Sequence, residues 1–233
     1  MKIRSLIEIS TLILGKLKRH QRKRVDTVVV KLNLGCGLAV YGDWINIDGS
    51  LNALIASWPR FMHRFMYRKT GANRYYSQEE YCRLLGDHKF IHHDLSYGIP
   101  LYDQSSDFVY SSHFLEHLFR SDAEHMLKES LRVLKPGGLL RLCVPDLEYA
   151  VSLYARGEKD AMLRNYFFVD DDNSYYARHK YMYDFNMLKA ILLKVGFQDV
   201  QRCAYREGLT PDILNIDNRP EDTLFIEARK FKP

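Results

Sequence analysis

The chain has 233 residues, of which 46% are hydrophobic and 27% are charged, a composition that favours one globular domain over disordered or fibrous structure. The formal net charge is +5, but residues 1–31 carry nine basic and two acidic side chains, and the net charge of the remaining residues is −2. Because the positive excess belongs to one segment and not to the whole surface, we expect no nucleic-acid partner. Four widely spaced cysteines argue against a disulfide framework or a zinc knuckle and favour a reducing compartment.

Residues 1–27 are predicted to form a basic amphipathic leader helix. Its apolar side chains recur at helical spacing and are Ile3, Leu6, Ile7, Ile13, Leu14 and Leu17. The apolar stretch is far shorter than the roughly 20 residues that span a bilayer, and most of the positive charge follows it, unlike in a signal peptide. We therefore expect a cytoplasmic protein. Two roles stay open: contact of residues 1–24 with an anionic membrane at its inner face, or a helix that caps the domain.

Strands and helices alternate through residues 28–233, the predicted main domain. The expected strands are 28–34, 44–48, 90–93, 107–111, 139–144, 200–205 and 223–228, and the clearest helices are 122–133 and 186–195. This alternation predicts an α/β fold with a mostly parallel, seven-stranded sheet and helices on both faces. The last two strands lack a clear helix between them, so we expect them to pair antiparallel at one edge.

Residues 51–86 and 146–185 exceed a minimal sheet and are predicted to be insertions. The first contains seven aromatic residues, Trp58, Phe61, Phe65, Tyr67, Tyr75, Tyr76 and Tyr81, among six cations, Arg60, Arg64, Arg68, Lys69, Arg74 and Arg83. Aromatic faces beside cations suit sugars, phosphates or nucleotides. The alternative is a helical hairpin that buries these aromatic rings in its own core.

A ligand site is predicted where the first two strands end. Gly35 and Gly37 follow the first strand and let the backbone approach a ligand, while Asp48 ends the second strand, where a carboxylate can accept both hydroxyls of a ribose. Only 13 residues separate Gly35 from Asp48, against roughly 20 in dinucleotide-binding folds. The intervening helix should therefore be short or absent, which disfavours a nicotinamide cofactor.

Five motifs in order resemble the class I S-adenosylmethionine-dependent methyltransferases, especially the type 11 group. The motifs are L-N-L-G-C-G at 32–37, Asp48, H-D-L at 93–95, residues 107–118, and R-V-L-K-P-G-G at 132–138. The last of them contains a turn between a helix and a strand, to which we assign no chemistry. The resemblance covers about residues 30–145 and implies a Rossmann-like fold and the cofactor S-adenosyl-L-methionine.

The resemblance also implies a role for each motif residue. Gly35, Cys36 and Gly37 would line the methionine part of the cofactor, Asp48 would hold its ribose, Asp94 and Leu95 would face the adenine, and Ser111, Ser112 and His113 would close the floor. Two positions depart from the family pattern. Asn33 replaces the usual acid and would bond the cofactor's amino group without adding charge, and Ala39 replaces the third glycine.

The histidines near residue 115 allow two interpretations. His113, Glu116 and His117 match the H-x-x-E-H pattern of inverted zinc peptidases, but that pattern belongs inside a helix with a third ligand, whereas here it directly follows a strand. Some family relatives place metal-binding acids here, yet the carboxylate set is incomplete, so we expect no metal. His117 is then the predicted general base, and His179 is predicted to face the same cleft. The alternatives are a packing histidine at 117 and a surface histidine at 179.

The sequence thus predicts transfer of a methyl group from S-adenosylmethionine to a small or glycan-like acceptor. O-methylation of a sugar in a surface polysaccharide or glycolipid is the first hypothesis, because the basic and aromatic insertion and the basic leader suit an acceptor at a membrane face. One alternative is N- or O-methylation of a soluble aromatic or amine metabolite. Another is a cofactor-binding module without catalysis.

Overall fold

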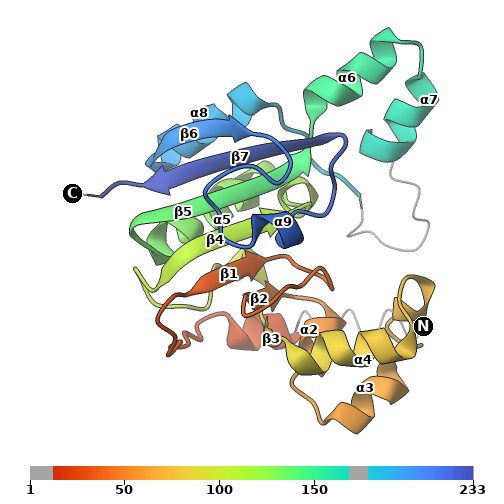
Figure 1. Cartoon of the computed structure of the whole chain (residues 1–233). Coiled ribbons are helices and arrows are strands. Elements are labelled where there is room, and N and C mark those ends of the chain that lie inside the picture. The colour runs from red at the N-terminus through yellow and green to blue at the C-terminus, as the bar shows by residue number, and fades with distance from the viewer. Residues whose placement is uncertain (1–12, 168–177, 233) are drawn as a thin grey trace.

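One seven-stranded sheet organises the protein. The computed structural model describes residues 13–167 and 178–232, and its strands lie in the order β3-β2-β1-β4-β5-β7-β6 (Figure 1). They are β1 (Lys31–Leu34), β2 (Ile45–Asp48), β3 (Lys89–His92), β4 (Ser106–Ser112), β5 (Leu134–Pro145), β6 (Phe197–Cys203) and β7 (Thr223–Lys230). Strands β1 to β5 pair in parallel, and β7 runs antiparallel between β5 and β6. The predicted mostly parallel sheet with an antiparallel edge is confirmed.

Strand β5 begins earlier than the sequence predicts. Helix α5 (Arg120–Val133) leads directly into it, and the pairing with β4 shifts from Leu134 opposite Ser106 to Leu139 opposite Phe108. The K-P-G-G residues 135–138 therefore form a bulge within the strand, where Gly137 has a φ of +80° that glycine tolerates. The segment links a helix to a strand, as expected.

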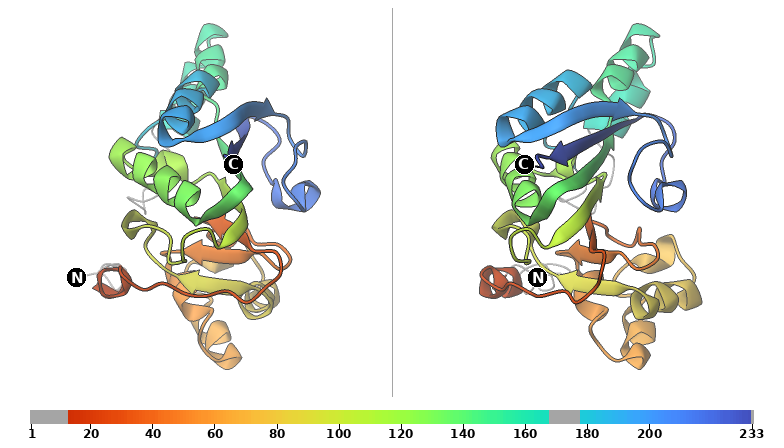
Figure 2. Two further views of the ribbon diagram at one scale, coloured as in Figure 1. Left: turned by 90° about the vertical axis from the view of Figure 1, so that its left-hand side faces the viewer. Right: turned by 60° about the vertical axis from the view of Figure 1, so that its left-hand side comes forward.

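Helices cover both faces of the sheet, as predicted. Successive side chains of a strand point to opposite faces, so Val109 and Leu142 join the main core while Tyr110 and Cys143 join a second core. Helices α5 and α8 (Phe185–Val195) lie side by side over the main core (Figure 2). The short helix α9 (Ile213–Ile216) packs on the second core.

The first predicted insertion folds into a small helical unit with a core of its own. It comprises α2 (Leu51–Ile55), α3 (Arg60–Met66), the 3₁₀ turn η1 (Ala72–Arg74) and α4 (Gln78–Asp87). Four of its aromatic residues, Trp58, Tyr67, Tyr76 and Tyr81, belong to this core or pack against it. Phe61, Phe65 and Tyr75 are instead 73%, 65% and 78% exposed. The alternative of a small helical core therefore holds for four of the aromatic residues, while the exposed rings leave the ligand-binding interpretation as a prediction.

The second predicted insertion leaves the sheet at the end of β5 and returns to the same place. Helices α6 (Leu147–Ala155) and α7 (Lys159–Met162) and the π-helical turn η4 (Leu163–Phe167) extend beyond the sheet (Figure 1). The chain returns at Tyr183, which forms a parallel bridge with Asp146 and accepts a backbone hydrogen bond from Leu147. This pairing fixes residues 178–183 beside the carboxyl end of β5.

The leader packs against the domain over part of its length. Residues 13–18 are helical, Lys23 bridges to Leu101 in parallel, and Val25 packs against the main core. Residues 1–12, which include the predicted apolar positions Ile3, Leu6 and Ile7, lie outside the described residues. Within the described ranges, no helix is long and apolar enough to cross a membrane.

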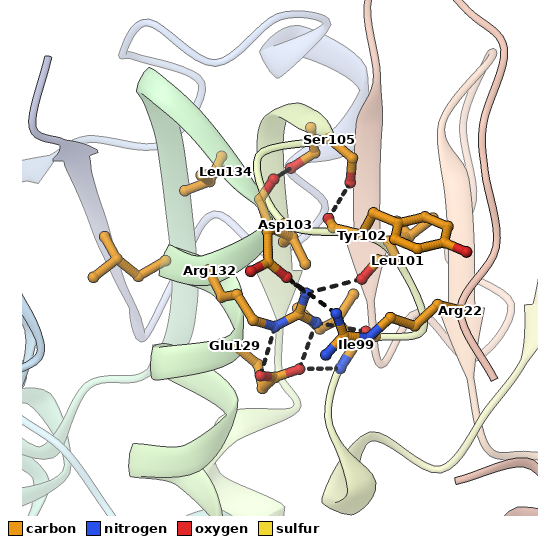
Figure 3. A network of polar contacts seen from close by, with 12 residues as sticks. Arg22, Ile99, Leu101, Tyr102, Asp103, Ser105, Glu129, Arg132 and Leu134 are labelled. Carbon is orange, nitrogen blue, oxygen red and sulfur yellow. Dashed lines mark hydrogen bonds and ion pairs between the residues drawn. The ribbon is translucent and has the colours of Figure 1, made fainter. Parts of the chain in front are cut away.

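Polar contacts reinforce this docking (Figure 3). Arg22 donates to Asp103 at 3.2 Å, Asp103 also pairs with Arg132 at 2.7 Å, and Arg132 is fixed by Glu129 on the same helix at 2.7 Å. Contacts therefore cross the predicted boundary between residues 27 and 28, in line with the alternative of a leader that caps the domain. The sequence could not show these contacts, because the partners of Arg22 and Lys23 lie about 80 residues further along the chain.

Candidate functional site

The predicted site residues follow the carboxyl ends of parallel strands and therefore share one edge of the sheet. Gly35 comes after β1, Asp48 ends β2, Asp94 follows β3 and His113 follows β4. Two backbone contacts tie these ends together: Gly35 N donates to Ile47 O at 2.9 Å, and His93 N donates to Asp48 O at 3.1 Å.

The loop between β1 and β2 contains turns and no helix across residues 35–44, as its short spacing predicts. Gly35 and Gly37 have φ values of +65° and +53°, which glycine adopts without strain. A Cβ atom at Gly35 would lie 2.1 Å from the Phe114 ring, whereas one at Gly37 would meet nothing within 4 Å. Gly37 therefore faces open space, and Gly35 supports the aromatic ring that follows β4.

Asn33 lies beneath this loop. Its side chain is 1% exposed, and its amide nitrogen donates to Ala39 O at 2.9 Å and to Asn46 Oδ1 at 3.0 Å. The residue thus links the loop to β2. Its predicted contact with the amino group of the cofactor stays a prediction.

Asp48 is well placed to bind hydroxyls. One carboxylate oxygen accepts from Gly37 N at 2.9 Å and the other from Ser50 N at 2.7 Å, which leaves further lone pairs on both oxygens. Burial and the charge of Asp48 raise the pKa of the Cys36 thiol well above its usual range, so this thiol is neutral. An open glycine loop beside an anchored carboxylate fits the methionine and ribose parts of S-adenosylmethionine.

The predicted adenine side comprises Asp94 and Leu95, and their place beside the adenine stays a prediction. The side chain of Leu95 is 4% exposed within the main core, so it does not line an open surface. Asp94 accepts from Ser96 N and Ser96 Oγ at 3.0 and 2.7 Å. A Cβ atom at Gly15 would lie 3.0 Å from Asp94 Cβ, so the leader helix borders this side. Sequence reasoning missed this contact, because nothing in residues 13–18 indicates a partner.

The residues predicted to close the floor of the cofactor site, Ser111, Ser112 and His113, lie where the chain turns sharply at the end of β4. Ser111 is buried and donates through Oγ to Leu34 O at 3.2 Å. Ser112 ends β4, and the next residue, His113, has a φ of +49°, unusual for a residue with a side chain. His113 Nε2 lies 3.1 Å from Thr223 Oγ1, and Arg219 donates to His113 Nδ1 at 3.3 Å. His113 is thus held by β7 and the loop before it.

His117 and His179 lie close together, and their predicted catalytic roles stay a prediction. The 3₁₀ turn η3 (Leu115–His117) lies along the returning segment of the second insertion, where Lys180 N and Tyr181 N donate to Glu116 O at 2.8 and 3.2 Å. The rings of His117 and His179 are 5.1 Å apart between centroids. Burial lowers the pKa of His179, which favours a neutral ring.

Glu116, to which the sequence assigned no catalytic role, lies between these histidines and His113. Its side chain is 1% exposed, and one oxygen lies 3.5 Å from His113 Nδ1 and 3.7 Å from His117 Nε2. Burial raises the pKa of this carboxyl, but the adjacent His113 and His117 imidazoles outweigh that effect, and the net pKa lies below the usual range. Glu116 is therefore a buried anion beside the predicted bases.

Comparison with known proteins identifies the type of domain. Residues 32–142 match the type 11 family model described as a methyltransferase domain. A S-adenosylmethionine-dependent methyltransferase from Archaeoglobus fulgidus is 17% identical, with a TM-score of 0.52 over 96% of this chain and 94% of that one. A Haloferax volcanii methyltransferase, solved with the Trm112 methyltransferase activator, is 17% identical, with a TM-score of 0.51 over 100% and 99%. These structures share the fold. No curated protein matches the chain.

Proposed function

The chain is a S-adenosylmethionine-dependent methyltransferase of the type 11 group, and on this premise we propose that it methylates a hydroxyl oxygen of a sugar in a surface polysaccharide or glycolipid. The observation that carries this proposal is the cluster of Glu116, His117 and His179 at the sheet edge that also holds the glycine loop. Phe114 connects the glycine loop to the cluster, because its ring lies against Gly35 and the residue directly precedes η3.

In this proposal the first two strand ends hold the cofactor and the cluster acts on the acceptor. Bound S-adenosylmethionine supplies an electrophilic methyl group on a sulfonium, and its transfer to a hydroxyl leaves a neutral sulfide, a methyl ether and one proton to be removed. The backbone at Gly37 and the carboxylate of Asp48 position the cofactor. Glu116, His117 and His179 would position the hydroxyl and assist loss of its proton, because their acceptor atoms lie within 4.8 Å of one another.

The first insertion supports a sugar as the acceptor. Phe61, Phe65 and Tyr75 present their rings to solvent, and Lys69 lies 4.2 Å above the centroid of the Phe65 ring. Exposed aromatic faces can stack on the apolar faces of sugar rings, and nearby cations attract the phosphate groups that accompany glycolipids.

We also propose that residues 1–24 contact the inner face of an anionic membrane in the cytoplasm, which would bring the enzyme to a lipid-linked acceptor. Ile13 and Leu17 lie one helical turn apart and are 56% and 74% exposed, and Lys16 and Arg19 between and beside them are exposed as well. Basic residues near an anionic surface contribute about 1 kcal/mol each.

Isolation of the methylated product tests the acceptor. The full chain would be incubated with isotope-labelled S-adenosylmethionine in parallel reactions. Each reaction would contain one class of acceptor: a glycolipid fraction, soluble sugars, aromatic metabolites or amine metabolites. We expect label in a sugar O-methyl ether, identified by mass spectrometry of the hydrolysed product. Label only in an aromatic or amine metabolite would refute the sugar proposal. Cofactor binding without label in any product would indicate a binding module instead.

Vesicle sedimentation tests the membrane contact. Because residues 22–25 contact the domain, a double variant, Ile13→Ser with Leu17→Ser, is a cleaner test than truncation. We expect the unaltered chain to sediment with anionic but not neutral vesicles and to be released as salt rises, since screening acts over about 8 Å at physiological ionic strength. The double variant should stay in solution. No sedimentation of the unaltered chain with anionic vesicles at low salt would contradict the proposal.

A further inference from the structure

The buried carboxylate of Glu116 lacks a hydrogen-bond partner. Neither oxygen has one among the described residues, and the nearest nitrogens, on His113 and His117, lie at 3.5 and 3.7 Å. An ionised carboxylate removed from water is costly unless a cation or hydrogen-bond donors compensate it. The position of Glu116 therefore calls for a positive charge in the space that it faces.

The two histidines that share this space both direct an unprotonated nitrogen into it when neutral. His117 Nδ1 lies 3.2 Å from Arg178 O, and His179 Nδ1 lies 2.7 Å from Tyr166 O. A carbonyl oxygen only accepts hydrogen bonds, so each Nδ1 carries the hydrogen and each neutral ring keeps a lone pair on Nε2. Histidines that bind metals are oriented in the same way, with the second ring nitrogen donating to a carbonyl or carboxylate.

We propose that Glu116, His117 and His179 bind one divalent transition-metal ion. Their ligand atoms lie within 4.8 Å of one another. Ligands at about 2.0–2.2 Å from a tetrahedral ion are roughly 3.4 Å apart, so small side-chain rotations complete the site. Two imidazoles and one carboxylate favour Zn²⁺ or another first-row ion over Mg²⁺ or Ca²⁺, and three protein ligands leave a coordination position open.

His113 has a supporting part in this site. Its Nε2 contacts Thr223 Oγ1, and its Nδ1 accepts from Arg219, so both ring nitrogens already have partners. The sequence-based expectation of no metal considered only residues 113–117, where the carboxylate set is incomplete. The return of the second insertion adds His179, which supplies the third ligand.

The role of the ion rests on the proposed function. An acceptor hydroxyl at the open position would lose its proton more readily, because a bound cation stabilises the resulting oxyanion. His117 and His179 would then act on the acceptor through the ion instead of taking the proton themselves.

Metal binding can be measured without any acceptor. The chelator-treated full chain would be titrated with Zn²⁺ and with Mn²⁺ by calorimetry, beside the variants His179→Ala and Glu116→Gln and the control His125→Ala, which removes an exposed histidine of α5. Circular dichroism and thermal unfolding establish that each variant is folded. We expect one ion per chain for the unaltered protein and the control, and at least about tenfold weaker binding for both site variants. Co²⁺ absorption spectra should report two nitrogen ligands in the unaltered chain and in the control, and fewer in His179→Ala.

Absence of stoichiometric binding, or equal affinity in a folded His179→Ala variant, overturns the metal site. If either site variant does not fold, His117→Gln with its Co²⁺ spectrum replaces it. Cofactor binding and product formation are measured on the same samples. Full sugar methylation by the metal-free chain would refute the catalytic role of the ion alone, whereas metal binding without sugar methylation would refute the proposed acceptor and leave the metal site in place.

Discussion

The proposed cofactor side and the proposed acceptor side are built in different ways. The proposed cofactor side consists of the ends of β1 and β2, where Gly35, Gly37 and Asp48 lie within 14 residues of one another. Gly37 N donates to Asp48, and Gly35 N donates to Ile47 O beside it. The acceptor side joins η3 to residues 178–181, which are about 60 residues apart in sequence. Short-range geometry positions the first group, and long-range packing positions the second.

This difference has consequences for how each side responds to substitution. On the proposed cofactor side, backbone conformation and one carboxylate would determine binding, so variants should change cofactor affinity or stability. On the proposed acceptor side, Lys180 N and Tyr181 N donate backbone hydrogen bonds to Glu116 O. A side chain there can therefore be replaced while the backbone structure is kept. Variants of the acceptor side should therefore change turnover without changing cofactor affinity.

The largest effect is expected for His179→Ala. Loss of this side chain should lower kcat by about 10²–10⁴-fold, the usual contribution of groups that assist proton removal, and should leave the cofactor Kd unchanged. Steady-state kinetics with the identified acceptor and calorimetry with the cofactor measure the two quantities. The control His125→Ala should retain its kcat. A kcat within about threefold of that of the unaltered protein would show that His179 takes no part in turnover.

Gly35→Ala should disrupt the contact between the glycine loop and the Phe114 ring, which links the proposed cofactor side to the proposed acceptor side. A Cβ atom here meets the Phe114 ring at 2.1 Å and the backbone φ is +65°, so we expect the free energy of unfolding to fall by about 2–4 kcal/mol from overpacking and strain together. Gly42→Ala is the matched control, because its φ is +52° but nothing lies within 4 Å. Gly42→Ala should lower the free energy of unfolding, measured by urea denaturation, by only about 1 kcal/mol. Equal losses for both variants would contradict the contact with Phe114.

Asp48→Asn should weaken cofactor binding on the first side alone. An amide has one acceptor oxygen in place of two, so one ribose hydroxyl loses its charged partner, which should cost about 1.5–3 kcal/mol, or roughly 10–100-fold in Kd. Asp43→Asn, an exposed change just before β2, serves as the control. Calorimetry of cofactor binding measures both. An unchanged Kd for Asp48→Asn would remove Asp48 from the cofactor site.

The smallest effect is expected where the leader borders the cofactor side. Arg22 and Asp103 are 49% and 61% exposed at their side chains, so Arg22→Ala should lower the free energy of unfolding by no more than about 1 kcal/mol. Arg19→Ala, whose side chain bonds only its neighbour His20 among the described residues, should have no effect. A loss of several kcal/mol for Arg22→Ala would mean that the docked leader is an essential part of the fold.

The strand ends were predictable because their signals are local. Alternating apolar residues identify the strands, glycines mark the turn after β1, and Asp48 stands at the end of a buried strand. The prediction that the helix between β1 and β2 is short or absent followed from residue spacing alone. Burial was not predictable where it depends on distant partners: the side chain of Leu95 lies in the main core, which its own sequence neighbourhood does not encode, and its predicted place beside the adenine stays a prediction.

The sequence by itself determined the fold class, the family and the positions of the glycine loop and Asp48, because each rests on spacing within one or two neighbouring elements. Only the tertiary structure decided that His179 lies beside His117, that Glu116 is buried between histidines without a hydrogen bond, and that residues 22–25 pack on the domain. These arrangements join residues about 60–80 positions apart. Their contacts come from how the second insertion and the leader return to the sheet, and no local periodicity specifies that return.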